Sequence, residues 1–450
     1  MVDLMVSEQR SGTTEKGVPA GFKLTEVGII PQDWECVPFG NLFKTNIKKI
    51  NVSDHELVSF IGMQDVSEDA KLKNSIQLPF KEIKSGFTYF EKGDVLLAKI
   101  TPCFENGKGC HTAELPTNVG FGSTEFHVLR ENEDSDSRFI YFWTTEKKFR
   151  SSLESEMVGS AGHRRVPLVA IKTYLIPCPK NRKEQRAIAD TLSDVDNFII
   201  ASEKLIAKKQ AIKTATMQQL LTGKTRLPQF ALRDDGTAKG YKETELGIVP
   251  EDWSIFTIGD IADVKTGPFG SSLHEKDYVL DGTPIITVEH LGELGITYQN
   301  LPMVSDEDKH RLRSYQLNEG DIVFSRVGSV DRNGLICKEQ SGWLFSGRLL
   351  RVRLKNNYHS PTYLSFQFHS TPFKNRVIEV AVGQTMPSLN TKILKVIAIT
   401  MPGYEEQTAI ATILSDMDKE IQTLQQRLDK TRQLKQGMMQ ELLTGKTRLI

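Results

Sequence analysis

Two long stretches of the chain carry the hydrophobic periodicity of α-helices and contain neither proline nor glycine. They run from Glu184 to Leu221 and from Glu405 to Gln436. In the second stretch the apolar residues step alternately by four and three positions, which is the heptad spacing of a coiled coil. At ~1.5 Å per residue a helix of about 38 residues would be roughly 57 Å long, and two such copies predict a pair of packed rods. The predicted seam consists of Ile188, Leu192, Val195, Ile199 and Ile206 in the first helix and Ile410, Leu414, Met417, Ile421, Leu424 and Leu428 in the second.

The charges along these helices predict that they pack antiparallel. The first helix begins with acidic residues such as Glu184 and Asp196 and later carries Lys209 and Lys213. The second is likewise acidic first and basic afterwards, so each helix suits its own macrodipole. Parallel pairing would set like charges together, whereas antiparallel pairing sets acidic halves against basic ones. As a hypothesis, the pair holds two globular domains at its opposite ends; the alternative is that these charges only solvate exposed faces.

Outside the two helices the pattern changes to short apolar runs that are typical of strands, separated by loops rich in glycine, asparagine and proline. Examples are "GDVLLAKI", "TYLIPCP", "GDIVFSRV", "LLRVRL" and "VIAITMP". These runs predict a globular domain of the α+β or α/β class before each long helix.

The chain is an internal repeat of two halves. The segment "KLTEVGIIPQDWECVPFGNLF", which begins at residue 23, matches "KETELGIVPEDWSIFTIGDIA", which begins at residue 242. Further matches join "EKGDVLLAKI" to "NEGDIVFSRV" and "EQRAIADTLSDVD" to "EQTAIATILSDMD". The first pair of matching segments begins 219 residues apart. A repeat of this length is too long for a solenoid and indicates two homologous halves related by a pseudo-twofold. The shared Trp34 and Trp253 are predicted to be core anchors, because tryptophan buries a large apolar surface.

The repeat divides the chain into segments of different character. They are a flexible tail (1–22), a first globular domain (23–180), a first long-helix segment (181–227), a linker (228–241), a second globular domain (242–402) and a second long-helix segment (403–450).

The octapeptide "LLTGKTRL" at residues 220–227 and 442–449 is similar to the end of a phosphate-binding loop. A Walker A loop needs a glycine five residues before its Gly-Lys-Thr, and Gln218 stands there instead. The alternative, which we favour, is a helix C-terminus in which Gly223 is the left-handed cap.

The composition excludes some classes of protein but does not identify a binding partner. Lys+Arg and Asp+Glu both number 57, so only local basic faces could attract nucleic acid. The five cysteines are scattered without a C-x-x-C pair, which argues against a zinc site and favours a reducing compartment. The apolar runs are far shorter than the ~20 residues of a membrane span, and the N-terminus lacks an apolar signal core. We therefore expect a cytoplasmic protein that does not associate with a membrane.

Two dissimilar domains, each followed by a long helix with motifs such as "EQRAIADTLSDVD" and "QQLLTGKTRL", resemble the specificity subunit of type I restriction–modification enzymes. The resemblance covers nearly the whole chain after the tail. It implies that each variable domain is a target recognition domain reading one half of a split double-stranded DNA site. It also implies that the repeated helices set the spacing between half-sites and dock two modification (methyltransferase) subunits, with restriction/translocase subunits joining through the complex.

The resemblance further implies that this chain is not an enzyme and binds no cofactor or metal. Partner subunits would use S-adenosylmethionine, ATP and Mg for adenine-N6 methylation and ATP-dependent cleavage. The sequence lacks an Asn/Asp-Pro-Pro-Tyr/Phe methyltransferase tetrapeptide and a complete ATP loop. The alternatives are a stand-alone nuclease or methyltransferase, a repeat-built protein scaffold, and a specificity subunit of a related restriction class.

Basic and amide side chains in loops beside the predicted strands are the candidates for touching DNA. Arg or Lys recognises guanine, Asn or Gln recognises adenine, and contacts to phosphates set the register. We align "GSAGHRRVP" of the first half with "VGQTMPSLN" of the second. For every candidate the alternative is a solvated loop residue. The candidates are Lys99, Asn106, Lys108, His163, Arg164 and Arg165 in the first half and Lys265, Ser271, Ser272, Arg326, Arg332, Asn333 and Gln384 in the second.

Because the two domains differ, the two half-sites are expected to differ in sequence. Helices of this length exceed the ~34–36 Å of one DNA turn, so the heads could face successive major grooves. Apolar and small residues off the seam are expected to form the docking surface of the modification subunits. They include Ala187, Leu205, Met217, Leu221, Ala409, Ile413 and Met439.

Overall fold

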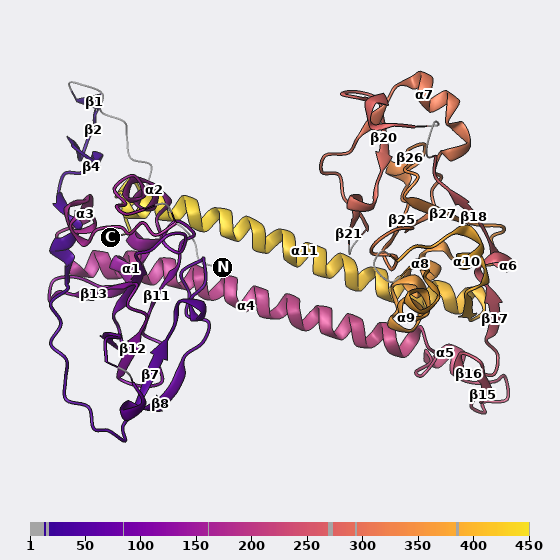
Figure 1. Cartoon of the computed structure of the whole chain (residues 1–450), viewed down its shortest axis with the longest axis horizontal. Coiled ribbons are helices and arrows are strands. Elements are labelled where there is room, and N and C mark those ends of the chain that lie inside the picture. Colours follow the sequence, from indigo (N-terminus) through magenta and orange to yellow (C-terminus); the bar gives the residue numbers. More distant parts are fainter. Residues whose placement is uncertain are drawn as a thin grey trace. The chain divides into compact units, whose positions relative to one another are not determined.

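The computed structural model describes residues 13–14, 18–83, 85–160, 162–268, 273–292, 295–383 and 387–449. The chain forms two compact units. Unit 1 comprises Met1–Ser202 with Arg427–Ile450, and unit 2 comprises Glu203–Gln426. Each unit contains one β-rich domain together with part of each long helix, α4 (Arg182–Leu220) and α11 (Tyr404–Leu443) (Figure 1).

The β-rich domain of unit 1 is built on two sheets with strand orders β11-β10-β13-β6 and β8-β7-β12-β9. A hairpin β3-β4 and the pair β5-β14 lie beside them. The strands are β3 (Phe22–Thr25), β4 (Gly28–Pro31), β5 (Trp34–Pro38), β6 (Phe43–Lys44), β7 (Leu57–Ile61), β8 (Ile76–Pro79), β9 (Thr88–Glu91), β10 (Val95–Ala98), β11 (Gly109–His111), β12 (Val119–Gly122), β13 (Phe126–Glu131) and β14 (Leu175–Pro179), preceded by β1 (Thr13–Thr14) and β2 (Val18–Pro19). Three short helices complete it: α1 (Ser137–Thr145), α2 (Lys147–Glu154) and α3 (Leu168–Thr173).

Unit 2 repeats this plan with sheets ordered β18-β27-β24-β25 and β19-β23-β20-β26, a hairpin β15-β16 and the pair β17-β28. The strands are β15 (Tyr241–Thr244), β16 (Gly247–Pro250), β17 (Ser254–Thr257), β18 (Ala262–Thr266), β19 (Tyr278–Val279), β20 (Thr283–Ile286), β21 (Leu291–Gly292), β22 (Gly295–Ile296), β23 (Met303–Val304), β24 (Ile322–Ser325), β25 (Asn333–Leu335), β26 (Leu344–Phe345), β27 (Leu349–Leu354) and β28 (Ala398–Met401). Its helices are α5 (Pro228–Ala231), α6 (Ile258–Ile261), α7 (Asp306–Arg311), α8 (Pro361–His369), α9 (Thr371–Val380) and α10 (Thr391–Val396).

The two units therefore share one topology, and the predicted internal repeat is confirmed. The order β11-β10-β13-β6 in unit 1 corresponds to β25-β24-β27-β18 in unit 2. The strand runs predicted from sequence become β10, β14, β24, β27 and β28. Both domains are mainly β-sheet, and the described strands pair antiparallel except β7 with β12 and β20 with β26. They are thus α+β domains, since parallel pairing is confined to one junction in each.

Each unit has a core in which a tryptophan is fully enclosed, as the repeated "DW" predicts. Trp34 is 0% exposed and Trp253 is 1% exposed. Around Trp34 the α1 side chains Phe139 and Phe142 pack against the start of α4 and the end of α11. The helices are therefore part of each domain's core rather than separate rods, because their apolar faces complete it.

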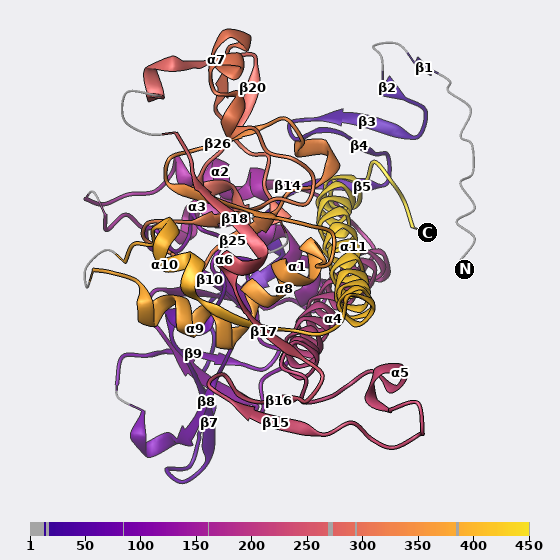
Figure 2. The same cartoon turned by 90° about the vertical axis from the view of Figure 1, so that its right-hand side faces the viewer.

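The long helices pack antiparallel within each unit, as the charge pattern predicts (Figures 1 and 2). In unit 1 the Lys435 ammonium lies 2.8 Å from both carboxylate oxygens of Asp196. In unit 2 Lys209 pairs with Glu420 at 2.7 Å, and Lys213 pairs with Asp418. The partner numbers fall as the α4 numbers rise, which is the order that antiparallel packing requires.

The residues assigned to the seam lie mostly inside. Ile188, Leu192, Ile199, Ile206, Ile410, Leu414, Ile421 and Leu428 are buried, and Val195, Met417 and Leu424 are half-buried. Leu434, a weaker position of the same heptad, is 61% exposed. The expected docking residues Leu221 and Met439 are buried in the cores of units 2 and 1, so this part of the expectation is wrong. Each is covered by the β-rich domain of the other repeat, while Leu205 and Ile413 remain exposed.

The octapeptide "LLTGKTRL" ends each long helix. Gly223 (φ +69°) and Gly445 (φ +71°) adopt the left-handed conformation of a C-terminal cap. Neither copy follows a strand, so the phosphate-loop alternative does not apply.

Candidate nucleic-acid interface

In unit 1 the candidate residues gather where strand β10 ends. Lys99 follows β10, its main-chain nitrogen donates to the Glu125 carbonyl (2.9 Å), and its own carbonyl accepts from Val166 (2.8 Å). The Thr101 amide donates to the Arg164 carbonyl at 2.9 Å. Two loops are therefore held together, which we call the strand-end loop (residues 99–108) and the facing loop (residues 158–166).

Unit 2 has the same main-chain arrangement at the end of β24. The Arg326 amide donates to the Arg348 carbonyl (2.9 Å), and the Arg326 carbonyl accepts from Leu389 (2.8 Å). The Gly328 amide donates to the Pro387 carbonyl at 3.0 Å. Lys99 and Arg326 thus occupy equivalent positions, and the alignment of "GSAGHRRVP" with "VGQTMPSLN" is reproduced. The strand-end loop of unit 2 is residues 326–332, and its facing loop is the described part of 382–389.

The arginines of the facing loop in unit 1 carry carboxylate partners. Arg165 donates to both oxygens of Glu125, at 2.8 and 2.9 Å, and Arg164 lies 3.5 Å from Glu105. The hydrogen bonds from Arg165 hold the pKa of Glu125 below its usual value. Both pairs are partly exposed, so each contributes little to stability.

The remaining candidates of unit 1 lie on the same two loops. The Asn106 amide donates to Glu68 at 3.0 Å, and the Lys108 ammonium donates to the Met63 carbonyl at 3.0 Å. His163 is exposed at the tip of the facing loop. The structure thus brings all six candidates of the first half onto one pair of adjoining loops.

The candidates of unit 2 are more dispersed. Arg326 donates to the main-chain carbonyls of Leu389 and Gly347, both at 3.3 Å, and Arg332 is exposed. Lys265 lies within β18, where it donates to the Ser314 carbonyl (2.8 Å) above the Tyr315 ring. Burial and the nearby Arg351 lower the pKa of Lys265. Ser271, Ser272 and Gln384 lie outside the described residues.

Asn333 requires a correction, because it is not a loop residue. It begins strand β25 and is 1% exposed. Among the described residues neither its amide nitrogen nor its amide oxygen has a hydrogen-bond partner. The following Gly334 allows this strand, since a Cβ there would approach Ile296 to 2.6 Å. A side chain enclosed in this way does not reach a base edge.

Glu125 and Arg348 were missed by sequence reasoning. They precede the equivalent strands β13 and β27, where Ala98 pairs with Phe126 and Ser325 pairs with Leu349. Aligning "STEFHVLR" with "SGRLLRVRL" would have placed them together. At one position of a shared scaffold, unit 1 carries an acid and unit 2 carries a base.

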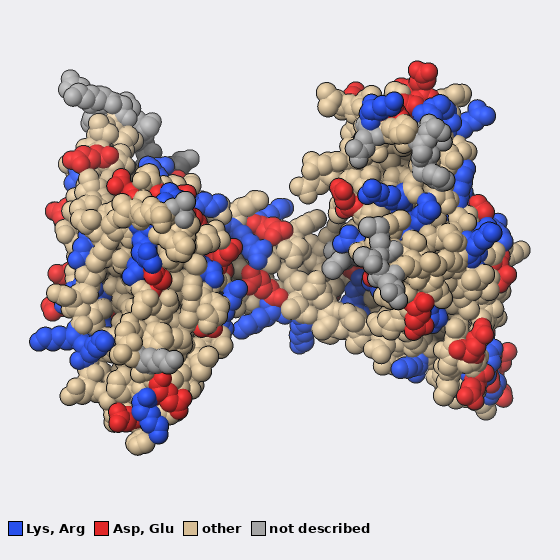
Figure 3. All heavy atoms as spheres, viewed as in Figure 1, with Lys and Arg blue, Asp and Glu red and all other residues tan. Residues whose placement is uncertain are grey.

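The charge on the surface is mixed. On the face drawn in Figure 3, basic and acidic side chains are interspersed over both units. Within the described ranges no group of three or more His, Cys, Asp or Glu side chains is placed to hold a metal ion. On this face, local loops rather than one extended basic patch would therefore have to engage a nucleic acid.

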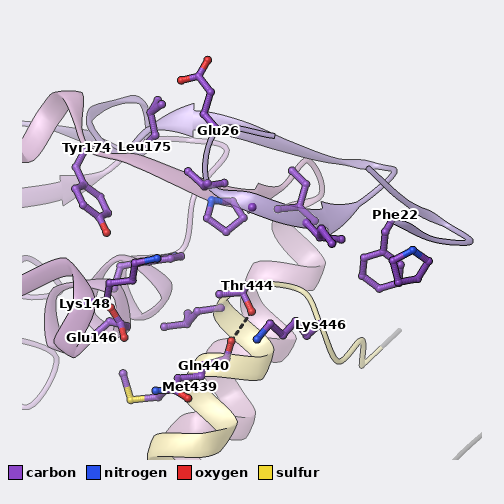
Figure 4. Close-up of a pocket in the computed structure, with 18 residues that line it drawn as sticks. Phe22, Glu26, Glu146, Lys148, Tyr174, Leu175, Met439, Gln440, Thr444 and Lys446 are labelled. Atoms are coloured by element: carbon purple, nitrogen blue, oxygen red, sulfur yellow. Dashed lines mark hydrogen bonds between the residues drawn. The ribbon is translucent and has the colours of Figure 1, made fainter. Parts of the chain in front are cut away.

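Unit 1 also contains a cavity of about 1120 Å³ beside the end of α11 (Figure 4). Its lining includes Glu26 from the turn of the β3-β4 hairpin, Lys148 from α2 and Lys446 after α11. The buried indole nitrogen of Trp143 has no hydrogen-bond partner among the described residues. In unit 2 Gln367 takes the equivalent helix position and donates to the Leu221 carbonyl at 2.8 Å. Carboxylates and ammonium groups both line the cavity, so its chemistry defines no single ligand class.

No helix in the described part of the chain has the length and apolar character needed to cross a membrane. The repeated β-rich domains, each packed on two antiparallel helix segments, define a class of proteins built from two homologous domain-and-helix repeats. The chain belongs to the family of type I restriction modification DNA specificity domains, whose model matches residues 31–214 and again 250–432. It is therefore a DNA specificity subunit with two target recognition domains, the non-catalytic component of a type I restriction–modification system.

Curated relatives support this membership over nearly the full length. The type I restriction enzyme MjaVIII specificity subunit of Methanocaldococcus jannaschii is 24% identical over 426 residues, covering 93% of this chain and 94% of that protein. The EcoEI specificity subunit of Escherichia coli is 24% identical over 491 residues, covering 90% and 81% respectively.

Solved structures support the fold. The type I restriction–modification S subunit from M. genitalium is 15% identical, with a TM-score of 0.56 and coverage of 94% of this chain and 98% of that one. A chain from a structure on complex assembly and conformational transition of the type I system gives a TM-score of 0.55 at 15% identity, covering 93% and 99%. The predictions of fold class and family are thus confirmed.

Proposed function

We propose that each target recognition domain reads one half of an asymmetric, bipartite site on double-stranded DNA. The domains would be residues 23–180 and 242–402, followed by the spacer helices 181–227 and 403–450. The observation that carries this proposal is that both domains have the same main-chain arrangement at the ends of β10 and β24 but different side chains there. The clearest difference is Glu125 in unit 1, whose equivalent position in unit 2 is Arg348. Because base edges are recognised by donors and acceptors, unlike side chains on one scaffold call for unlike half-sites.

Most of the proposed contacts belong to the strand-end and facing loops, and Lys265, Ser271 and Ser272 belong to the segment around the end of β18. Exposed or half-exposed members, such as Arg165 and Arg332, would reach phosphates or base edges without unfolding the loop. Arg326 lies at the base of both loops in unit 2, where its guanidinium is held by main-chain carbonyls. The proposed set is Lys99, Asn106, Lys108, His163, Arg164 and Arg165 in the first domain and Lys265, Ser271, Ser272, Arg326, Arg332 and Gln384 in the second.

The partners of the proposal are two modification subunits, with restriction/translocase subunits joining through the assembled complex. Two such subunits are expected because the chain offers two equivalent helix surfaces. The aligned residues Ile212 on α4 and Leu434 on α11 are 42% and 61% exposed, although both are large and apolar. Exposed apolar side chains at equivalent positions are typical of a surface that a partner covers.

The chemistry of the assembled system would belong to those partners. They would bind S-adenosylmethionine for adenine-N6 methylation and ATP with Mg for translocation and cleavage. The described cysteines are all free, in keeping with a cytoplasmic setting where the DNA lies.

A panel of single-base variants of the target tests the reading function. In Arg326→Ala, discrimination at one base-pair position of one half-site should fall by about 1–3 kcal/mol, the contribution of a bidentate base contact. Filter binding of the complex measures this, with Arg332→Ala as a matched loop variant and assembly checked by size exclusion. Unchanged preference at every position would contradict base reading by Arg326. Wild-type binding that is indifferent to both sequence and salt would contradict DNA reading itself, because phosphate contacts make affinity salt-dependent.

A further inference from the structure

A buried arginine lies directly beneath the strand-end loop of unit 1. Arg150, on helix α2, is 7% exposed. Its Nη1 donates to the Phe104 carbonyl (2.7 Å), its Nη2 to the Gly107 carbonyl (3.0 Å), and both lie 3.4 Å from the Lys108 carbonyl. Its Nε donates to the Thr144 carbonyl at the end of α1 (2.7 Å). One guanidinium therefore ties two helices to the far side of this loop.

The acceptors are unusual for a buried cation, because all of them are main-chain oxygens. None of the ion pairs formed by the described residues involves Arg150. Its charge is met by carbonyl dipoles and by the Phe104 ring, whose centroid lies 5.1 Å away. Burial lowers the pKa of Arg150 to about 10, which leaves it charged at neutral pH. Enclosing a charge without a carboxylate is costly, so the loop carbonyls are essential partners.

The loop itself is a compact turn held by its own main-chain hydrogen bonds. Its amides at Asn106, Gly107 and Lys108 donate to carbonyls within the loop, at 2.9, 3.0 and 2.9 Å. Gly107 has φ +89°, and a Cβ there would lie 2.2 Å from the Glu68 carbonyl. Asn106 is exposed, while the carbonyls face inward to Arg150.

The second unit places a cation at the same helix position. Phe149 and Phe373 are equivalent, because each donates its amide to the capping side chain of its helix, Glu146 in α2 and Ser370 in α9. The next residue is Arg150 in unit 1 and Lys374 in unit 2. Lys374 lies 3.9 Å from Asp331, a residue of the strand-end loop of unit 2. Both domains thus connect this helix position to the loop after the central strand by different chemistry.

We infer that Arg150 is the positioning residue of the first recognition domain, setting the path of the strand-end loop through its carbonyls. The inference rests on the proposed reading of DNA by that loop. Because Arg150 binds only main-chain oxygens, the loop can change its exposed side chains, and therefore its preferred bases, without changing shape. Lys374 and Asp331 provide the corresponding connection in the second domain.

Hydrogen exchange and half-site discrimination together test this role in the full chain bound to its partners. Arg150→Lys keeps the charge but cannot span several carbonyls. We expect the amides of residues 106–108 to exchange about tenfold faster in this variant, while those of β10 stay protected. Discrimination at one half-site should fall about tenfold, with the other half-site unchanged.

The control is Arg130→Lys, the same substitution in the same domain. Arg130 donates to Asp94 and Glu91 at 2.7–2.8 Å and does not contact the loop. Equal loop exchange in Arg150→Lys and wild type would overturn the inference, as would an equal effect of Arg130→Lys. Should Arg150→Lys fail to fold, Asn106→Gly and Lys374→Met remain informative, and Lys374→Met is expected to affect only the other half-site. If the loop amides of Arg150→Lys exchange faster but the wild-type protein shows no base preference, the result would instead refute the DNA-reading function.

Discussion

At the scale of single residues, the arginine of "LLTGKTRL" explains why this octapeptide occurs twice. Arg226 donates to both oxygens of Glu406 (2.7 Å each) and to Asp252, and it lies 5.9 Å from the Trp253 ring centroid. Arg448 makes the same contacts with Glu184, Asp33 and Trp34. Each arginine joins the end of one long helix to the start of the other and to the buried tryptophan. The motif is thus a structural clamp.

Removing the clamp should destabilise one unit at a time. Arg226 and Glu406 have side chains only 6% and 4% exposed, so Arg226→Ala leaves a buried carboxylate unpaired. We expect a loss of about 3–5 kcal/mol in the unfolding free energy of unit 2. Arg448→Ala likewise leaves a buried carboxylate, Glu184 at 5% exposed, but should cost less because the Arg448 side chain is itself 31% exposed. Hydrogen exchange resolved by unit measures both, and equal losses in the two variants would contradict the burial argument.

At the scale of elements, the pair of long helices is specified by charge as well as by its apolar seam. Lys213 on α4 and Asp418 on α11 are 16% and 25% exposed, and they are partners across the pair. Half-buried pairs of this kind fix which segments lie opposite each other, even where their net contribution to stability is modest.

Exchanging these two charges tests the antiparallel register. Lys213→Asp and Asp418→Lys should each destabilise unit 2, because each sets like charges together. The double variant should recover most of the loss, with a coupling of about 1 kcal/mol in a double-mutant cycle. Thermal unfolding measures the four proteins, and additive losses would mean that the two residues are not partners in solution.

The exposed apolar residues of the helices form the proposed docking surface. Ile212→Asp should remove one modification subunit from the complex, and Leu434→Asp should remove the other, because burying a new carboxylate in an apolar contact is costly. Native mass spectrometry counts the subunits, and Thr214→Asp, a substitution at an exposed residue of α4, is the control. Full occupancy in the double variant would place the docking surface elsewhere.

The long helices were predictable because their heptads and their lack of proline and glycine are local signals. The strand runs were predictable for the same reason, since "GDIVFSRV" carries its pattern in adjacent residues. The candidate DNA-contacting residues were harder to predict. "DRNG" resembles a turn, yet Gly334 lets Asn333 enter a strand against Ile296. The role of Arg150 could not be predicted from the sequence, because the loop carbonyls it binds lie more than forty residues away along the chain.

At the scale of the whole molecule, neither compact unit is built from one repeat alone. Unit 1 comprises the chain up to Ser202 together with Arg427–Ile450, which belongs to the second repeat. Unit 2 likewise takes the second part of α4 from the first repeat. Each recognition domain is therefore packed on helix segments from both repeats.

Because both recognition domains are packed on the same two long helices, the proposal that these helices set the DNA spacer gives a prediction for its length. Inserting seven residues in both helices, after Ser202 and after Gln426, keeps the heptad seam in register and lengthens each helix by about 10 Å. With about 34 Å per ten base pairs, the accepted spacer should grow by about three base pairs while both half-site sequences stay the same. Mapping of methylated sites in a host carrying the variant measures this. Four residues inserted in α4 alone should abolish methylation, because they rotate one apolar seam away from the other. A spacer unchanged by the paired insertion would mean that something other than helix length determines the distance between half-sites.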